Sequence, residues 1–271
     1  MSSRKILSLY GLKWNPFLPN IPAEALWRTP ENEHFLYRFE NLVIDGGFAL
    51  ITGDPGLGKS KSLHLLAQQL SKLEDVTVGV MERPQSSLND FYREMGELFN
   101  VDLIPSNRYG GFKSLRERWH SHIKTTLFRP VLLIDEAQEM ETVCMNELRM
   151  LGSSEFDSRN LLTTILCGDM RLPERFRSSD LLALGSRIQL RMVLEPYDKS
   201  KLYDYLKHAL KHAGAEYLMT DGLMQTLAEH SAGNLRVLNS MAAELLVVAA
   251  KKELSQLDEK LFIEQYSQKR N

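Results

Sequence analysis

The chain has 271 residues, of which 43% are hydrophobic and 25% charged, so it is long enough for one large globular domain and a smaller one. Its net charge of −2 excludes an overall basic field, so any surface for a polyanion must be local. The two cysteines, Cys144 and Cys167, exclude a disulfide framework and fit a reducing, cytoplasmic compartment, and no apolar run is long enough to span a membrane.

The N-terminal residues are predicted to form an arm. Pro16, Pro19, Pro22 and Pro30 prevent a continuous helix between residues 14 and 29. The following segment, 31–44, has the apolar spacing of an amphipathic helix. We therefore assign residues 1–30 to an arm and begin the next domain at residue 31.

Short apolar runs then alternate with helical patterns as far as residue 196. Strands are expected at 48–52, 76–81, 131–134, 161–167 and 188–194. Helices are expected at 59–70, 88–99, 112–128 and 140–151, with a loop at 100–111 and a charged loop with helical turns at 171–184. Such alternation is typical of an α/β layer with a parallel sheet. Residues 31–196 are expected to form this α/β core.

Beyond residue 198 the sequence has only helical patterns. The expected helices are 201–213, 222–231, 234–252 and 258–268. The change of pattern lies near Pro196. We therefore predict a helical subdomain at 197–271.

The first chemical signal follows the first strand of the core. Gly53 to Ser60 reads GDPGLGKS, a match to the phosphate-binding pattern G-x-x-x-x-G-K-[ST]. A glycine-rich turn between a strand and a helix directs backbone N–H groups and a helix N-terminus at one spot, where a phosphate can bind. Lys59 is expected to reach the outer phosphates, and the Ser60 hydroxyl to bind Mg²⁺. The sequence therefore predicts a site for ATP and Mg²⁺ formed by Gly53, Asp54, Pro55, Gly56, Leu57, Gly58, Lys59, Ser60 and Lys61.

The second signal is VLLIDEAQ, at residues 131–138, about 75 residues after the phosphate loop. An apolar strand that ends in two carboxylates places charge at the edge of a parallel sheet, where ligands bind. Asp135 is expected to hold the Mg²⁺ through water, and Glu136 to orient and deprotonate an attacking water. The alternative is an acidic helix start, because Asp and Glu favour that position.

Together these two motifs resemble those of AAA+ ATPases. The resemblance implies a P-loop α/β core with a C-terminal helical lid, and ATP hydrolysis at the interfaces of a homo-oligomer. In CGDMRLPERF it implies that Asp169 is the polar sensor at a strand tip, where the family more often has Asn or Thr. In SAGNLRVLNSM it implies that Arg236 contacts the γ-phosphate from the lid.

An arginine finger is the third residue that the resemblance implies. GSRIQL resembles the family segment that supplies this finger, which indicates Arg187. Three nearby arginines are rivals for the role: Arg171, Arg175 and Arg177. A solvated surface charge is the alternative for each of these arginines and for Arg236.

The opening, LYGLKWNPFLPN, resembles a narrower branch that includes ExeA-type secretion ATPases and transposition ATPases such as TniB, TnsC and MuB. Secretion members carry a membrane segment and a cell-wall-binding region after the ATPase, and neither is recognised here. The resemblance therefore implies an ATP-dependent regulator that assembles on duplex DNA as a ring or helical filament. It would direct a transposase to target DNA, together with a target-selection adaptor protein. The alternative is a nucleotide-gated adaptor for secretion or helicase loading that does not bind DNA directly.

A local basic segment could provide the DNA surface. Residues 108–129 hold six Lys and Arg side chains against the single acid Glu117. Contacts from such a segment to phosphates would give affinity without sequence readout. The candidates for DNA contact are Arg108, Lys113, Arg116 and Lys124. A solvated helix face is the alternative.

Overall fold

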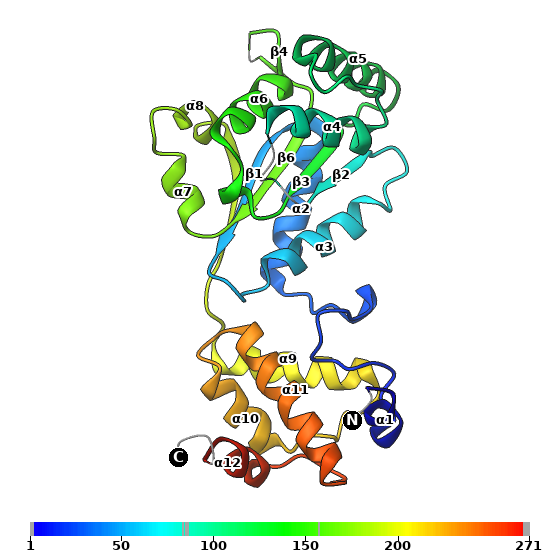
Figure 1. The fold of residues 1–271 in the computed structure, drawn as a ribbon, viewed down its shortest axis with the longest axis vertical. Helices are drawn as coiled ribbons and strands as arrows, with labels where there is room; N and C mark the ends of the chain where they lie inside the picture. Colours follow the sequence, from blue (N-terminus) through cyan, green and yellow to red (C-terminus); the bar gives the residue numbers. More distant parts are fainter. Residues whose placement is uncertain (1–2, 83, 85–86, 157, 268–271) are drawn as a thin grey trace. The chain divides into compact units, whose positions relative to one another are not determined.

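The structure is a computed structural model that describes residues 3–82, 84, 87–156 and 158–267. The chain divides into two compact units, which are described separately below (Figure 1). The sheet unit comprises Thr29–Pro55 and Lys59–Leu194, and the helical unit comprises Met1–Arg28, Gly56–Gly58 and Glu195–Asn271. The N-terminal segment thus groups with the C-terminal helices. The division into arm, core and lid stays a prediction.

The sheet unit is built on five parallel strands in the order β2-β3-β6-β1-β7. These strands are β1 (Gly47–Gly53), β2 (Val78–Met81), β3 (Val131–Ile134), β6 (Thr163–Gly168) and β7 (Ile188–Leu194). Every residue of β1, β3 and β6 is buried, as expected for inner strands of a sheet covered on both faces. The edge strand β7 instead alternates between buried and exposed residues. The predicted α/β fold with a parallel sheet is confirmed.

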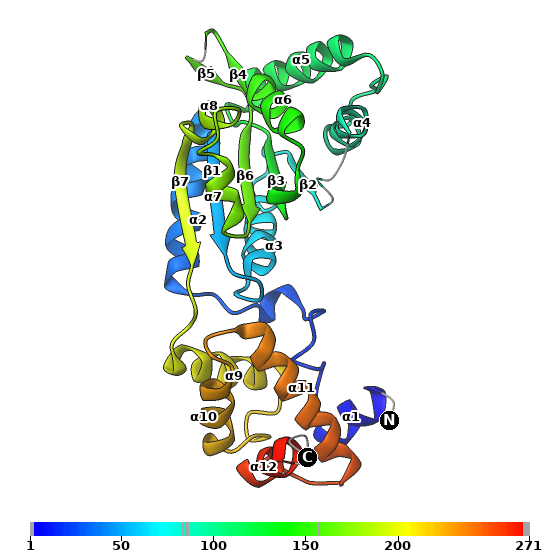
Figure 2. The ribbon, with the colours of Figure 1, turned by 60° about the vertical axis from the view of Figure 1, so that its left-hand side comes forward.

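Helices cover both faces of this sheet (Figure 2). One core joins α4 (Leu88–Phe99), α5 (Arg108–Thr126) and α6 (Thr142–Gly152) to the sheet through strand residues such as Leu50 and Leu132. On the other face, α2 (Pro30–Asp45) and α3 (Lys59–Leu70) contact β1 and β6. The short helices α7 (Arg171–Arg175) and α8 (Leu182–Gly185) follow β6 and lie where the sequence predicted helical turns.

The helical unit has its own core. It contains α9 (Lys199–Ala213), α10 (Asp221–His230), α11 (Leu235–Lys251) and α12 (Glu259–Ser267), which confirms the four helices predicted after residue 198. Gln268, the predicted end of the last helix, lies outside the described residues. A further helix, α1 (Ser3–Tyr10), and a 3-10 turn, η1 (Ala23–Ala25), precede the sheet unit in the chain. Ile6 of α1 is buried in the same core as Leu245 of α11.

One local prediction was wrong, and one small element was not predicted. Helix α5 begins at Arg108, inside the predicted loop 100–111, because the Asn107 side chain caps it by accepting from the Gly110 N–H at 3.0 Å. Gly111 also fits this helix closely against Tyr92, since a Cβ there would lie 2.7 Å from the ring. A small hairpin, β4 (Ser153–Ser154) with β5 (Arg159–Asn160), was not predicted and precedes β6.

Both thiols belong to the buried part of the sheet unit. Cys144 lies in α6 and Cys167 in β6, and both are 0% exposed. Burial, with smaller contributions from nearby carboxylates, raises the pKa of Cys144 to about 11 and raises that of Cys167 further. Among the described residues, no helix combines the length and apolarity needed to cross a bilayer.

Candidate nucleotide-binding and catalytic site

Three neighbouring strands of the sheet unit deliver the predicted site residues to one edge. In the strand register, Thr52 of β1 is paired with Gly168 of β6, and Ile134 of β3 with Leu166 of β6. The strands are parallel, so their carboxyl ends meet. The sheet edge therefore brings together the start of the phosphate loop, Asp135 and Asp169, in keeping with the place where ligands bind in such sheets.

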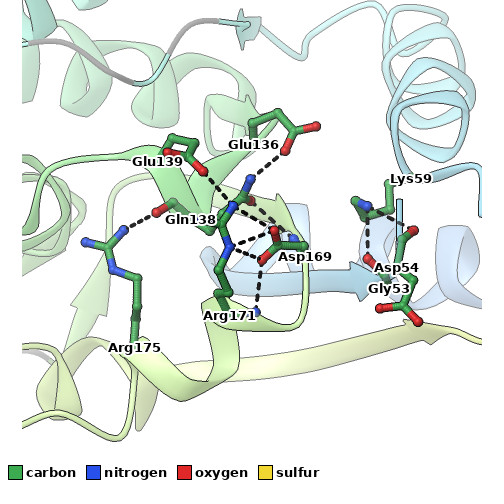
Figure 3. A network of polar contacts seen from close by, with 9 residues as sticks. All are labelled: Gly53, Asp54, Lys59, Glu136, Gln138, Glu139, Asp169, Arg171 and Arg175. Carbon is green, nitrogen blue, oxygen red and sulfur yellow. Dashed lines mark hydrogen bonds and ion pairs between the residues drawn. The ribbon is translucent and has the colours of Figure 1, made fainter. Parts of the chain in front are cut away.

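Lys59 is held by the loop that it follows. Its Nζ donates to the carbonyl of Gly53 at 2.9 Å and to that of Asp54 at 3.2 Å (Figure 3). The residue is 7% exposed, so little water reaches these bonds. Lys59 begins α3, and Ser60 follows it in the first turn, where free N–H groups and the helix dipole favour an anion. The arrangement can neutralise and orient phosphate oxygens.

The tip of the phosphate loop, Gly56–Gly58, belongs to the helical unit. Gly56 has a φ of +91°, and a Cβ there would lie 2.3 Å from the Asn234 side chain, so both backbone and space require glycine. The Arg236 N–H donates to the Gly56 carbonyl at 3.1 Å, and the Tyr197 hydroxyl to that of Leu57 at 3.3 Å. The side chain of Arg236 itself is exposed.

The acidic pair begins at the carboxyl end of β3. The Asp135 carboxylate accepts the Glu136 N–H at 2.9 Å and is also hydrogen-bonded by the Cys167 thiol. Glu136 adopts a left-handed backbone with a φ of 49°, uncommon for a residue other than glycine. No group of three or more His, Cys, Asp or Glu side chains in the described part of the chain could hold a metal alone. The assignment of an Mg²⁺ to Ser60 and Asp135 stays a prediction, in which waters and phosphate oxygens would be the other ligands of the ion.

Asp169 follows β6 and is paired with an arginine. The Arg171 Nε donates to its two carboxylate oxygens at 3.1 and 2.9 Å, and Arg171 also reaches Glu139 at 2.6 Å (Figure 3). Hydrogen bonding from Arg171, with a smaller contribution from the charge of Lys59, holds the pKa of Asp169 below its ordinary value. The negative charge that Asp169 brings to the site is therefore compensated within the sheet unit.

The four finger candidates have different surroundings. Arg171 is bound to Asp169 and Glu139, and Arg175 donates to the Gln138 carbonyl at 2.5 Å. Arg187 lies before β7 and donates to the Ala183 carbonyl in α8. Arg177 follows α7. Arg171, Arg175 and Arg187 therefore all make contacts within their own chain, and the assignment of the finger to Arg187 stays a prediction.

Gln138 is a functional candidate to which the sequence analysis gave no role. Its side chain bridges Glu136 and the backbone of Asp169. It is the last residue of the VLLIDEAQ motif, but no spacing rule marks a glutamine there. The contact partner lies 31 residues further on, so only the folded sheet reveals it.

The structure places the basic segment on α5 and in the loop after it. Arg108 is ion-paired with the buried Glu147, and Arg116 donates to the carbonyls of Met150 and Leu151 at 3.2 and 3.3 Å. Lys113 lies 3.8 Å from Glu117 and Lys124 is exposed. The two arginines therefore support the fold, whereas Lys113 and Lys124 are both exposed, and contact of these four residues with DNA stays a prediction.

A family model described as an AAA domain matches residues 44–176. The match contains the phosphate loop, the acidic pair and the tip of β6. The chain therefore carries an ATPase domain, and homologues of this kind bind nucleotide.

Similarity to individual proteins extends beyond the AAA domain. The chain is 28% identical over 245 residues to general secretion pathway protein A of Aeromonas hydrophila, covering 89% of this chain and 44% of that protein. It is 27% identical over 202 residues to the chromosomal replication initiator protein DnaA of Kosmotoga olearia, covering 73% of this chain and 40% of that protein. The chain thus spans less than half the length of both relatives.

The fold also resembles that of a solved structure. The Aeropyrum pernix ORC2 protein, determined as ADPNP and ADP complexes, superposes with a TM-score of 0.71 at 16% identity, over 91% of this chain and 69% of that one. At this identity the likeness concerns the fold alone. It agrees with an AAA domain followed by C-terminal helices.

Proposed function

We propose that the chain transfers the terminal phosphoryl group of ATP to water, with Glu136 orienting and deprotonating that water. The observation that carries this proposal is the meeting of three strand ends at one edge of the sheet unit. Lys59 and the N-terminus of α3 would hold the phosphates, and Ser60 and Asp135 an Mg²⁺. The bound Mg²⁺ would supply charge neutralisation on the phosphate oxygens.

The test of the proposed mechanism separates nucleotide binding from turnover. Glu136→Gln keeps the shape of the side chain but removes the base, so ATP should bind while turnover falls by roughly 10²-fold or more. Glu141→Gln is the matched control, because it removes an acid from the same segment at the start of α6. Wild-type turnover in Glu136→Gln would remove this residue from the mechanism.

An arginine finger in this proposal comes from a neighbouring subunit. Arg187→Ala should then lose hydrolysis while each subunit still binds ATP. Mixing Arg187→Ala with Lys59→Ala should restore part of the activity, since each variant supplies what the other lacks. No rescue at any mixing ratio would exclude Arg187, and Arg177 would be tested next.

For the wider role, we propose an ATP-dependent DNA-binding regulator that assembles head to tail and directs a transposase. The support is the resemblance of the opening segment and the exposed lysines of α5, and one relative bears the name of a chromosomal replication initiator. Lys113→Glu combined with Lys124→Glu should abolish the salt-sensitive binding of duplex DNA and leave ATP binding intact. Lys72→Glu combined with Lys260→Glu makes the same charge change elsewhere and is the control.

A second candidate role is a nucleotide-gated adaptor of the secretion-linked type. The observation that favours it is the similarity to general secretion pathway protein A over 89% of the chain. The DNA-binding proposal would be overturned in favour of this adaptor by either of two results. The first is an equal affinity for DNA in the Lys113/Lys124 double variant and in its Lys72/Lys260 control. The second is an affinity for DNA that does not change with ATP or salt.

A further inference from the structure

The side chain of Gln138 lies between Glu136 and the tip of β6 (Figure 3). Its Nε2 donates to Oε2 of Glu136 at 2.5 Å, and its Oε1 accepts the Asp169 N–H at 3.2 Å. Gln138 belongs to the 3-10 turn η2 (Ala137–Glu139) and is only 7% exposed. The amide of Gln138 is therefore largely shielded from water.

The bond from Asp169 determines which end of the amide faces Glu136. A peptide N–H can only donate, so it requires the carbonyl oxygen of Gln138. The NH₂ group then faces a carboxylate, which can only accept. A flipped amide would set donor against donor and acceptor against acceptor, and both bonds would be lost. The backbone at the β6 tip thus ensures that Glu136 meets a donor.

Two further residues keep Gln138 in this place. A Cβ on Gly168 would lie 2.4 Å from Oε1 of Gln138, so the absence of a side chain there leaves room for the amide. Arg175 donates to the Gln138 carbonyl at 2.5 Å and to the Thr142 hydroxyl at 3.3 Å, which fixes the backbone of the turn. Gln138 is therefore held at both its backbone and its side chain.

Glu136 would have little to orient it without this amide. The residue is exposed, and in the described part of the chain its Oε1 has no protein partner. A free glutamate side chain samples several rotamers, and holding it in one costs conformational entropy. The bond to Oε2 restricts the carboxylate and leaves Oε1 open.

We infer that Gln138 is a positioning residue for ATP hydrolysis, which holds the Glu136 carboxylate by one oxygen, ties it to the β6 tip and leaves the other oxygen for the attacking water. The inference rests on the proposed role of Glu136 as the base. Gln138 touches neither the phosphates nor the water in this arrangement. Its contribution is to turnover and not to nucleotide affinity.

The first test compares kcat with the affinity for a fluorescent, non-hydrolysable ATP analogue. In Gln138→Ala, kcat should fall roughly 10- to 100-fold, because a base that is misplaced by an ångström loses about that much. The Kd of the analogue should stay within about twofold of wild type, because binding groups are untouched. Gln138→Glu keeps the shape and replaces the donor with an acceptor, so it should lose as much kcat as Gln138→Ala.

The second test displaces the Gln138 amide by a substitution at Gly168, which lies next to it. Gly168→Ala should displace the amide and lower kcat without removing any functional group. The double variant with Gln138→Ala should be no slower than Gln138→Ala alone, because both changes act on one contact. Gly152→Ala is the matched control, since a Cβ there meets its nearest neighbours at 3.8 Å.

Measuring Glu136→Gln together with the Gln138 variants separates a failure of this inference from a failure of the proposed function. Full turnover in Glu136→Gln would overturn the proposed function and with it the basis of the inference. Lost turnover in Glu136→Gln with wild-type kcat in both Gln138 variants would overturn only the positioning role. A raised Kd with unchanged kcat in Gln138→Ala would also overturn it, because Gln138 would then serve binding.

Discussion

Arg108 shows how a basic side chain of α5 serves the interior of the sheet unit. Its Nε donates to Glu147 at 2.9 Å, and the Tyr92 hydroxyl donates to the same carboxylate. Glu147 is 2% exposed, whereas the Arg108 side chain is 62% exposed. Burial, and then the bond to Glu147, raises the pKa of Tyr92, so the tyrosine stays a donor. The arginine therefore compensates a buried negative charge.

Removing this arginine should destabilise the fold. Arg108→Ala would leave Glu147 with a neutral partner only, at an expected cost of about 2 kcal/mol in the free energy of unfolding. Lys124→Ala, an exposed residue of the same helix, should change it by less than about 0.5 kcal/mol. Urea unfolding measures both variants. If Arg108→Ala were as stable as Lys124→Ala, Arg108 would not be needed for the fold and would return to the DNA-contact candidates.

Lys59 is the residue on which nucleotide binding is expected to depend most. Nucleotide that binds only the folded state should stabilise the wild type by about 2.7 kcal/mol at a hundredfold excess over Kd. Lys59→Ala should lose this gain, because the main side-chain charge on the phosphates is gone. Thermal unfolding with and without MgATP reports it, with Lys72→Ala as the control. An undiminished nucleotide effect in Lys59→Ala would contradict the assignment of the phosphate loop.

At the scale of elements, the sequence predicts the bounds of a strand or helix best where residues close together in the chain determine them. Strands β3 and β7 begin and end as predicted, because β3 is one apolar run and β7 begins with apolar and polar residues in alternation. Helix α5 begins earlier than predicted because Asn107 caps it and Gly111 fits against Tyr92, a contact across 19 residues of chain. The two chemical motifs could be predicted as well, because each is one continuous run of residues. The hydrogen bond from the Asp169 N–H to Gln138 depends on strand pairing, so the sequence did not predict it.

The N-terminus of α9 gives a prediction that depends on pH. Asp198 caps this helix by accepting the Lys201 N–H at 2.7 Å, and that bond lowers its pKa. Because the folded chain favours the ionised carboxylate, Asp198 stabilises the fold fully at pH values above the pKa of an unfolded Asp, which is about 4. This stabilisation is lost as pH falls through the lower pKa that Asp198 has in the folded state. Asp198→Asn should therefore lower Tm at pH 7, and the difference should shrink as pH falls through the lowered pKa of Asp198.

A second cap serves as the control for this experiment. Thr29 caps α2 by accepting the Asn32 N–H at 3.2 Å and carries no charge. Thr29→Ala should cost about 1 kcal/mol at neutral and at acid pH alike. A difference for Asp198→Asn that is the same at both pH values would show that the carboxylate charge does not contribute.

At the scale of the whole molecule, each unit has its own core and is expected to respond to damage by itself. Leu245 of α11 and Leu132 of β3 are both 0% exposed and belong to different cores. Leu245→Ala should cost about 3 kcal/mol and reduce hydrogen-exchange protection mainly in α9 to α11. Leu132→Ala should instead reduce hydrogen-exchange protection mainly in the strands of the sheet unit and leave that of α9 to α11 in place. Equal loss of protection in both units for either variant would mean that the chain opens as one.

The burial of Cys144 and Cys167 makes the folded chain a natural background for site-specific labelling. These are the two cysteines of the sequence, and neither offers an accessible thiolate to a maleimide. A cysteine introduced at an exposed position such as Lys124 would then be the one that reacts. A dye placed there could report the arrival of DNA or of a second subunit, without first replacing either native cysteine.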